Sequence, residues 1–483
     1  MMERKENIPA IDQATINQTG EWELMHGVAL RNADGTARHC PYSIAPVTLE
    51  RTTYEKLVRV TPLISKLIHG VSEDQAFLEE NVTGAALADP FFGRLLKINK
   101  QIMANNPARL PLLIIRTDYM DDRNQGARVI EFNGIAAGMA PFGQRVHEFH
   151  RYVQMQWPEV FSRWVAADNG ELAVNKGLDN LAKGIADTAF EVRSRSDDKG
   201  KGKPVFIMVV QEDEDNVYDQ HLLEMKLLDL GVRPVRRTFD QLSKELSTGP
   251  NQRLILKDIG GVDVVYLRVG YQCIDYFIPG EPECCSALIN TRAYIEKHRV
   301  AMNATVSQQL ATSKTIQMVI TNMSAKQLSR WGLTEAEGVE VLSVLAEMKP
   351  IDANTATWLR DHADVHDWVL KNQGEGGGHC VFGSDIFTKL AELKPDKYKA
   401  WALMLRLFPH ERERPALAVR DNKASVVEDL ISEIGLFTVH FEGKPMAGDD
   451  GYAGYLIRSK PAQENEGGVH TGKGVLDSIL LIN

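Results

Sequence analysis

The sequence is poor in cysteine and contains no long apolar run. Its 483 residues include five cysteines at irregular spacings: Cys40, Cys273, Cys284, Cys285 and Cys380. An odd, sparse set of this kind forms neither a disulfide framework nor a zinc-binding pattern, so we expect reduced thiols and a cytoplasmic protein. No apolar stretch approaches the length of a membrane span, and the first residues lack the apolar core of a signal peptide. A membrane partner is therefore not expected.

The chain also lacks the positive charge that is typical of nucleic-acid-binding proteins. Lysine and arginine number 55 against 65 aspartates and glutamates, which gives a net charge of −10. This balance disfavours a nucleic acid or an anionic membrane as the main partner. The remaining composition, 43% hydrophobic and 25% charged, is that of an ordinary globular protein. The length is enough for about three domains or lobes.

A glycine-rich loop at residues 371–380 is the most informative stretch. It contains four glycines together with Lys371 and Glu375, and it follows an apolar segment at 368–370 that predicts a strand. Glycine lets the backbone approach a ligand closely, and amide groups beside one lysine and one glutamate suit a polyphosphate with its Mg²⁺. The alternative is a flexible linker, because short glycine motifs are common.

A carboxylate and an amide lie two residues apart on a second predicted strand, at residues 128–133. The side chains of Glu131 and Asn133 therefore share one face of that strand. Together they form a candidate site for a hard cation such as Mg²⁺. The alternative is a pair of solvated polar residues on an edge strand. The strand before it, at 110–115, leads into Arg116.

The middle of the chain predicts a small parallel sheet. Residues 191–203 are charged and contain glycine, as expected of a linker between domains. Strands and helices then alternate, with strands at 205–210, near 235, at 254–256 and at 262–268, and helices near 219–230 and 239–246. Because ligands bind at the carboxyl ends of parallel strands, a substrate is expected at residues 212–220 and 268–271.

One late motif imitates a nucleotide-binding loop. Residues 467–474 nearly spell a Walker A sequence, but Gly474 stands where the hydroxyl for Mg²⁺ is needed. The residues that follow are apolar and do not predict the helix start that would bind a phosphate. We interpret this segment as a glycine loop lining a site.

Taken in order, these segments resemble the eukaryotic-type glutathione synthetases, a family of ATP-grasp ligases. The resemblance rests on Arg-Thr-Asp-Tyr-Met at 116–120, Ile-Glu-Phe-Asn at 130–133, Val-Leu-Lys-Asn-Gln-Gly-Glu-Gly-Gly-Gly at 369–378, Ser-Glu-Ile-Gly at 432–435, and Leu-Ile-Arg-Ser-Lys at 456–460 with Gly-Gly-Val at 467–469. It implies an α/β protein with an ATP-grasp fold, a glycine-rich lid and an inserted small parallel α/β (Rossmann-like) substrate domain. The implied bounds are 1–202 and 306–483 for the main body, 203–305 for the substrate domain and about 350–420 for the lid.

The resemblance implies an ATP- and Mg²⁺-dependent ligase, acting as a homodimer. ATP phosphorylates the C-terminal carboxylate of γ-glutamylcysteine, and glycine attacks the acyl phosphate to give glutathione. No protein nucleophile is needed, which agrees with a sequence that has no Ser/His/Asp or Cys/His arrangement. The alternatives are a related ligase with another amino acceptor, and a nucleotide-binding interaction protein with little synthetase activity.

The resemblance also implies the residues of the site. The Mg²⁺ ligands are Glu131, Asn133 and Glu375. The other nucleotide residues are Lys314, Lys371, Gln373, Gly376, Gly377, Gly378, Phe382, Met404, Leu405, Arg406, Leu407, Glu433, Lys460 and Glu466. The substrate residues are Arg116, Ala136, Gly138, Glu214, Asn216, Gln220, Arg268, Tyr271, Arg458, Val469 and His470, of which Arg116 and Arg458 are catalytic.

The chain departs from the family pattern mainly at substrate positions. Ala136 and Gly138 replace two serines, and Leu405 replaces an acidic residue of the adenine hinge. The largest departure is His-Thr at 470–471, where the family has Ala-Ala in the acceptor pocket. An imidazole adds bulk and a group that titrates near neutral pH. We expect it to alter the choice of acceptor or to weaken glycine binding.

Overall fold

The computed structural model describes residues 11–104, 109–165, 169–198, 200–278, 285–374, 380–465, 467–469 and 472–483. A mixed sheet of 13 strands runs through these residues. Its order is β20 (Lys423–Val427), β19 (Ala416–Arg420), β3 (Tyr42–Ser43), β24 (Val475–Asp477), β23 (Tyr452–Pro461), β21 (Leu430–Phe441), β5 (Leu110–Asp122), β14 (Ala301–Asn303), β13 (Val264–Leu267), β8 (Val205–Val209) and β9 (Arg233–Arg237), with β6 (Gly126–Asn133) paired to β5 and β22 (Lys444–Pro445) to β21.

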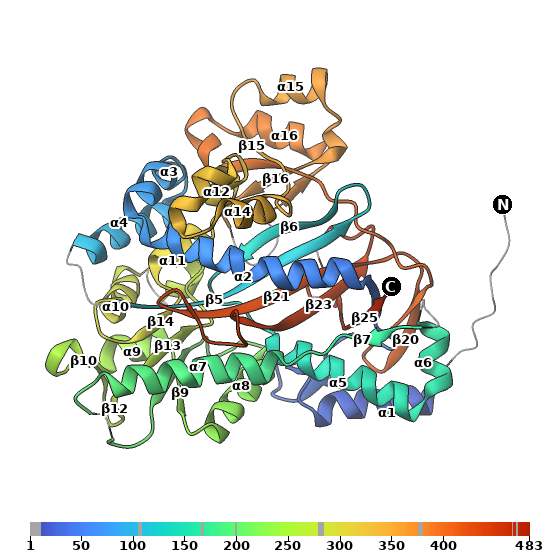
Figure 1. Cartoon of the computed structure of the whole chain (residues 1–483), viewed down its shortest axis with the longest axis horizontal. Helices are drawn as coiled ribbons and strands as arrows, with labels where there is room; N and C mark the ends of the chain where they lie inside the picture. Colours follow the sequence, from blue (N-terminus) through green and yellow to red (C-terminus); the bar gives the residue numbers. More distant parts are fainter. Residues whose placement is uncertain are drawn as a thin grey trace.

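Helices cover both faces of this sheet (Figure 1). They are α1 (Gln13–Met25), α2 (Arg51–Glu73), α3 (Gln75–Ala88), α4 (Pro90–Ala104), α5 (Ala140–Gln156), α6 (Pro158–Trp164), α7 (Gly177–Ser194), α8 (Val217–Asp229), α9 (Phe239–Glu245), α10 (Ser286–Glu296), α11 (Val306–Ala311), α12 (Lys314–Thr321), α13 (Ala325–Leu328), α14 (Glu335–Leu342), α15 (Thr355–His362) and α16 (Asp385–Glu392). Among the helices of the described residues, none is both long and apolar enough to cross a membrane.

Strand β5 shows why helices pack on both faces. Its apolar residues alternate between two core clusters: Leu113 and Ile115 pack with residues of α2, whereas Leu112 and Ile114 pack with residues of α5 and α7. Alternation of this kind is expected of a strand that is buried on both sides. The predicted strand at 110–115 is confirmed, and it continues to Asp122.

The predicted parallel sheet is confirmed, with one correction. Strands β14, β13, β8 and β9 pair in parallel, and β14 also pairs in parallel with the start of β5, so these strands extend the main sheet. The segment predicted as a further strand of this unit, β11 (Leu254–Leu256), instead pairs antiparallel with β10 (Leu246–Thr248) and β12 (Gly260–Gly261) in a separate sheet. The chain reverses there through Asp258 and Gly260, both with positive φ.

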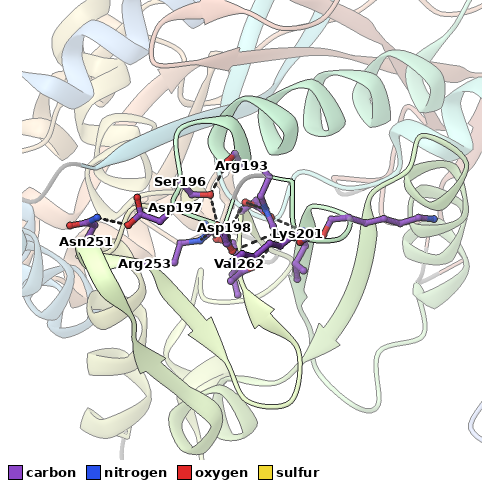
Figure 2. Close-up of polar contacts among 12 residues, drawn as sticks. Arg193, Ser196, Asp197, Asp198, Lys201, Asn251, Arg253 and Val262 are labelled. Atoms are coloured by element: carbon purple, nitrogen blue, oxygen red, sulfur yellow. Dashed lines mark hydrogen bonds and ion pairs between the residues drawn. The ribbon is translucent and has the colours of Figure 1, made fainter.

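The predicted linker at 191–203 is fastened to the sheet. Helix α7 continues to Ser194, and Arg193 near its end is buried. Its Nη2 lies 2.6 Å from Oδ2 of Asp263, and its Nη1 donates to the carbonyl of Lys201 at 3.0 Å. Arg253 and Asp198 complete the network (Figure 2). Arg193 therefore forms a buried ion pair with Asp263, whereas Arg195, Asp197, Lys201 and Lys203 of the same stretch are exposed, as expected of a linker.

A four-stranded antiparallel sheet carries the glycine-rich loop. Its order is β15 (Met348–Pro350), β18 (Trp401–Leu405), β16 (Trp368–Asn372) and β17 (Cys380–Phe382). It lies with α15 and α16 at the top of Figure 1, apart from the main sheet. The predicted strand before the loop is therefore confirmed as β16. The other small sheets contain β1 (Ala29–Arg31) with β2 (Ala37–His39), and β4 (Val47–Glu50) with β25 (Ile479–Ile482) and β7 (Glu171–Leu172).

The expectation of reduced thiols is wrong at one position. Cys273 is disulfide-bonded, whereas Cys40, Cys285 and Cys380 are not in disulfides. Pairing depends on how the fold brings two sulfur atoms together, which irregular spacing does not reveal. Since disulfides are typical of oxidising compartments, the cysteines no longer support a cytoplasmic location.

Candidate functional site

The charged residues of four strands gather on one face of the main sheet. On β5 and β6, Arg116 pairs in register with Asn133, and Asp118 with Glu131. This is the face that carries Leu112 and Ile114 at the start of β5. The same face is therefore apolar beneath α5 and α7 and becomes polar along the strand. The prediction that Glu131 and Asn133 share a face is confirmed.

Glu131 faces two lysines that come from other parts of the chain. Its Oε2 lies 3.0 Å from Nζ of Lys314, the first residue of α12. The Nζ of Lys371, on β16, donates to the carbonyl of Ile130 at 3.2 Å. Burial alone raises the pKa of Glu131, but the two ammonium groups hold it well below its ordinary value of 4.5. Glu131 is therefore an anionic oxygen donor between two cations.

Asp118 joins the two arginines that the sequence singles out. Its Oδ1 lies 2.6 Å from Nε of Arg116, and its Oδ2 lies 3.0 Å from Nη2 of Arg458. The same Oδ2 accepts from the side-chain amide of Asn133 at 3.0 Å. Only 1% of the Asp118 side chain is exposed. One buried carboxylate thus fixes both guanidinium groups and orients Asn133.

Arg458 also belongs to a second charged group, on β21 and β23. Oε2 of Glu433 lies 2.9 Å from its Nη2, and Oε1 of Glu433 lies 3.0 Å from Nζ of Lys460. Burial alone raises the pKa of Glu433, but Arg458 and Lys460 lower it below 4.5. Lys460 further donates to the carbonyl of Asn465 at 3.0 Å. These predicted site residues therefore lie together with Arg116 and Asp118.

The four-stranded sheet places the predicted hinge residues next to Lys371, one of the lysines that are predicted to bind the nucleotide. Met404 on β18 pairs in register with Val369 on β16, two residues before Lys371. Met404 and the partly buried Leu407 belong to a small apolar cluster that also includes Met318 of α12. Leu405 donates its N–H to the carbonyl of Glu347 at 2.8 Å.

Two further predicted nucleotide residues are in contact with each other, and a third, Gln373, ties the four-stranded sheet to α12. The guanidinium of Arg406 lies 5.5 Å from the ring centre of Phe382, a distance typical of a cation–π contact. Oε1 of Gln373, which is buried, accepts from the N–H of Thr315 at 3.1 Å. Gln373 therefore links the start of the glycine loop to the helix that begins with Lys314.

Five of the predicted substrate residues, Glu214, Asn216, Gln220, Arg268 and Tyr271, follow the carboxyl ends of β8 and β13. These strands pair in parallel, with Val209 opposite Leu267, so the residues that follow them meet at one edge. Glu214 and Gln220 come after β8, and Arg268 directly follows β13. Tyr271 is half-buried nearby on the chain and packs against the main core. Both predicted ligand segments are thus brought to the same edge of the sheet.

Several buried polar atoms at this edge have no hydrogen-bond partner within the described residues. Asn216 Oδ1, Asp219 Oδ1 and Arg268 Nε are buried and have no hydrogen-bond partner there. Burial raises the pKa of Glu214, although Arg268 partly opposes this. Native structures leave few buried polar groups unpaired. Two acceptors and one donor without a partner therefore lie on the segments that follow β8 and β13.

Of the remaining predicted substrate residues, Gly138 lies near Arg268 and Arg116, whereas Ala136 and Val469 are placed only by their backbone and their packing. Ala136 has a φ of 53°, which is unusual for a residue with a side chain. The carbonyl of Gly138 accepts from Nη1 of Arg116 at 3.3 Å. Val469 is buried in the core cluster beneath α5 and α7.

Several predicted residues lie outside the described part of the chain. They are Glu375, Gly376, Gly377, Gly378, Glu466 and His470, and their predicted roles stay predictions. Of the near-Walker segment, Gly474 is followed by strand β24. The interpretation that it is not a phosphate-binding loop opening a helix is therefore confirmed.

Three residues of the site were missed by sequence reasoning. Asp118 stands inside the Arg-Thr-Asp-Tyr-Met motif, two residues from Arg116, and strand alternation alone puts both on one face. Asp219 precedes Gln220 but looks like an ordinary helix-start carboxylate. Arg236, which donates to Oε1 of Gln220 at 2.5 Å and orients it, has no sequence signal that we can identify.

The chain resembles known proteins over nearly its whole length. Residues 10–481 match a family model described as eukaryotic glutathione synthase, ATP binding domain. Glutathione synthetase of Homo sapiens is 27% identical over 469 residues, which cover 94% of each chain. The chloroplastic glutathione synthetase of Solanum lycopersicum is 29% identical over 458 residues, covering 92% of this chain and 78% of the relative.

One solved structure has the same fold. It is the apo form of a glutathione synthetase-like effector from Globodera pallida, with a TM-score of 0.73 and 18% identity over 100% of both chains. At this level of identity the likeness concerns the fold alone.

Proposed function

The chain belongs to the eukaryotic glutathione synthase family, and from that membership we propose which of its residues perform the reaction. The protein is an ATP-dependent, ADP-forming ligase of glutathione synthesis, and its family requires Mg²⁺. One observation carries the assignment: the two cation-flanked carboxylates, Glu131 and Asp118, lie opposite each other on paired strands. Glu131 would hold the Mg²⁺ that binds the nucleotide phosphates. Asp118 would position Arg116 and Arg458, which bind the reacting carboxylate.

At the phosphate end, Lys314, Lys371 and Lys460 would neutralise the charge of ATP. Glu131 and Asn133 fit a Mg²⁺ ion, with Glu375 as the third ligand. The carboxylate of Glu131 stays ionised because of its lysine neighbours, and Asn133 donates its amide N–H to Asp118, which leaves its oxygen for a cation. When bound, Mg²⁺ neutralises developing charge on the transferred phosphoryl group.

At the carboxylate end, Arg116 and Arg458 would hold the C-terminal carboxylate of γ-glutamylcysteine. This carboxylate attacks the γ-phosphorus, ADP leaves, and an acyl phosphate forms. The amine of glycine then attacks the acyl carbon, a tetrahedral oxyanion forms, and phosphate leaves. The two guanidinium groups, fixed in advance by Asp118, stabilise the oxyanion without reorganising. Water is kept out by the lid, which protects the acyl phosphate.

The γ-glutamyl end of the dipeptide would bind to the buried polar atoms that follow β8 and β13 and have no hydrogen-bond partner within the described residues. Asn216 Oδ1 and Asp219 Oδ1 can accept from the α-ammonium, and Arg268 Nε can donate to the α-carboxylate. Glu214, Gln220 and Tyr271 complete this end. Such a set of donors and acceptors suits a free amino-acid head group.

For adenine, we propose the apolar cluster around Met404 and Leu407. This cluster is apolar, and one of its members, Ala402, pairs in register with Lys371. Arg406, held over Phe382, borders it. We also propose that the fold is of the ATP-grasp type. Its lid would lie at about 350–420, its substrate domain at 203–305, and its main body would consist of 1–202 and 306–483.

The identity of the amino acceptor and the assembly state are also part of the proposal. Glycine is the acceptor that we infer, and His470 is the residue most suited to change that choice. We infer a homodimer, supported by the exposed apolar side chains of Leu24 and Met25 at the end of α1.

A coupled ADP-release assay tests the function. Purified protein with millimolar γ-glutamylcysteine, ATP and Mg²⁺ should release ADP with glycine, and a panel of other small amines shows the acceptor preference. Glu375→Gln should abolish turnover while the protein stays folded, and the exposed Glu392→Gln on α16 serves as the matched control. The absence of turnover with any acceptor would leave only the nucleotide-binding alternative.

A further inference from the structure

A cavity lies between the carboxyl ends of β8 and β9, next to the predicted substrate edge. Its volume is about 320 Å³, which falls in the range of about 300–1,000 Å³ that small-molecule sites occupy. Its lining includes Gln211, beyond the end of β8, and Arg236 and Arg237, the last residues of β9. The two strands pair in parallel, and β13 pairs with β8 on its other side. The cavity therefore lies beside the proposed dipeptide site, on the opposite side of β8.

Arginine is the commonest charged residue in the lining of this cavity. Arg31 of β1, Arg236 and Arg237 contribute to it, against one exposed carboxylate residue, Glu212. Arg236 and Arg237 each form an ion pair with a glutamate outside the lining, with N···O distances of 3.0 and 2.7 Å. Arg31 pairs with no carboxylate of the described residues, and its Nη2 donates instead to the carbonyls of Glu212 at 2.9 Å and Glu214 at 2.8 Å. The cavity therefore contains a positive charge that lacks a protein counter-ion.

Two of these arginines also hold the segment that carries the predicted substrate residues after β8. Nη2 of Arg236 donates to Oε1 of Gln220 at 2.5 Å. This contact leaves Nε2 of Gln220, which is buried and has no partner within the described residues, for the dipeptide. Arg31 donates its N–H to the carbonyl of Asp215 at 2.9 Å and its Nη2 to that of Glu214. Any ligand that binds Arg31 and Arg236 in the cavity therefore acts on the segment that would bind the dipeptide.

We propose that this cavity is a second ligand site, which binds a small dianion of the phosphate class and thereby strengthens dipeptide binding at the neighbouring edge. The planar guanidinium groups of Arg31 and Arg237 suit the oxygens of such an anion. The bound anion supplies the counter-ion that Arg31 lacks. It also restrains Arg31 and Arg236, so the segment at 212–220 is ordered before the dipeptide arrives. The anion site goes beyond the proposed function, and only its effect on the dipeptide rests on that function.

Calorimetry with inorganic phosphate tests the site directly. The protein is first saturated with Mg²⁺ and a non-hydrolysable ATP analogue, so that phosphate cannot enter the proposed nucleotide site, and sodium chloride keeps the ionic strength constant. Phosphate should bind the wild type, and Arg237→Met should weaken this binding by about tenfold or more, as expected for lost charge-assisted hydrogen bonds. Arg233→Met is the matched control, because Arg233 is exposed on the same strand and outside the cavity lining.

A second variant changes the charge of the cavity while it keeps the local hydrogen bonds. Gln241 lines the cavity, and its Oε1 accepts from the N–H of Thr238 at 2.9 Å in the capping box of α9. Because glutamate makes the same capping contact, Gln241→Glu should fold. Its added carboxylate should lower the affinity for phosphate several-fold through like-charge repulsion. This variant decides the matter even where Arg237→Met does not fold.

Saturating phosphate should also lower the Kd for γ-glutamylcysteine by about fivefold or more in the wild type, and should not do so in Arg237→Met. Three outcomes overturn the proposal. They are a wild type that binds no phosphate once its nucleotide site is filled, equal phosphate affinity in the wild type and both variants, and phosphate binding that leaves the dipeptide affinity unchanged. The first is expected where a second copy of the chain covers the cavity. Phosphate binding by a protein that does not bind the dipeptide refutes the proposed function instead, and leaves the anion site standing.

Discussion

Asp118 and Arg458 form an ion pair across an intervening strand. Asp118 is on β5 and Arg458 is on β23, and β21 runs between them in the sheet. Their side chains nevertheless come within 3.0 Å, Oδ2 to Nη2. The residue of β21 opposite Asp118 is Gly435, which has no side chain to separate them. The charged face of the sheet therefore depends on a carboxylate, a guanidinium and a glycine on three neighbouring strands.

We expect Asp118→Asn to destabilise the protein and to raise the KM for the dipeptide. Removing this charge leaves Arg116 and Arg458 close together without their shared counter-ion. Breaking a buried pair in this way costs roughly 3–5 kcal/mol. Urea unfolding measures the stability, and steady-state kinetics should show the larger change in the dipeptide KM and the smaller one in the ATP KM. The exposed pair of Asp240 with Lys244 gives the control, Asp240→Asn, which should change little. Wild-type stability in Asp118→Asn would contradict the expectation.

Gly435→Ala should disturb the same pair from the opposite side. Its Cβ would lie 2.8 Å from Oδ1 of Asp118 and 2.8 Å from Cδ of Arg116, so both side chains must move. Overpacking of this kind costs about 1–3 kcal/mol. Thermal unfolding and dipeptide KM are the measurements. In an Asp118→Ala background the penalty should shrink, and an undiminished penalty would show that the strain arises elsewhere.

Lys314→Met should shift the acid sensitivity of the fold as well as weaken ATP binding. In the wild type, the pKa of Glu131 is held below 4.5. Its ionised form therefore stabilises the protein above about pH 4.5, and this contribution is lost as the pH falls. Without the Lys314 ammonium the pKa of Glu131 rises, so the loss should occur at higher pH. Urea unfolding from about pH 6 to about pH 3 tests this. The exposed Lys326→Met is the control, and identical pH profiles for Lys314→Met and the wild type would refute the expectation.

Glu23→Met should stabilise the protein at neutral pH. Glu23 is fully buried on α1, and neither of its carboxylate oxygens has a hydrogen-bond partner in the described residues. Burial raises its pKa well above 4.5. Because the folded state favours the protonated form, the contribution of Glu23 to stability is present below about pH 4.5 and is lost as the pH rises through its folded-state pKa.

The gain in Glu23→Met should be about 1–3 kcal/mol at neutral pH and should shrink towards pH ~4.5. Urea unfolding at two pH values measures it. Glu21→Met, at an exposed position of the same helix, should leave stability nearly unchanged. A gain in Glu23→Met that does not depend on pH would indicate better packing instead of relief of a buried charge.

Local patterns in the sequence predicted much of this fold. Alternation put Glu131 and Asn133 on one face, and the apolar run before the glycine loop predicted β16. Both features depend on residues that are neighbours in the chain, where the period of the strand decides the outcome. The alternation of strands and helices over 205–268 likewise predicted the parallel strands, although not the antiparallel pairing of β11.

Pairings between distant segments could not be predicted in this way. Lys314 of α12 meets Glu131 of β6, and Arg458 meets Asp118 across β21, only because the tertiary fold brings these distant segments together. Arg193 is a further example. It lies in the predicted linker, but its side chain is buried in an ion pair with Asp263. Whether a charged residue is a linker residue, a structural ion pair or a site residue depends on its partner, and partners are set by topology.

Strand β5 belongs to both halves of the substrate site. Its first residues pair with β14 and so with β13, after which Arg268 follows, while its middle carries Arg116 and Asp118. A continuous hydrogen-bonded sheet therefore sets the separation between the groups at the two ends of the dipeptide. Under the proposed function this fixed separation limits which donors bind at both ends, so we expect a β-aspartyl analogue, one methylene shorter, to bind more weakly.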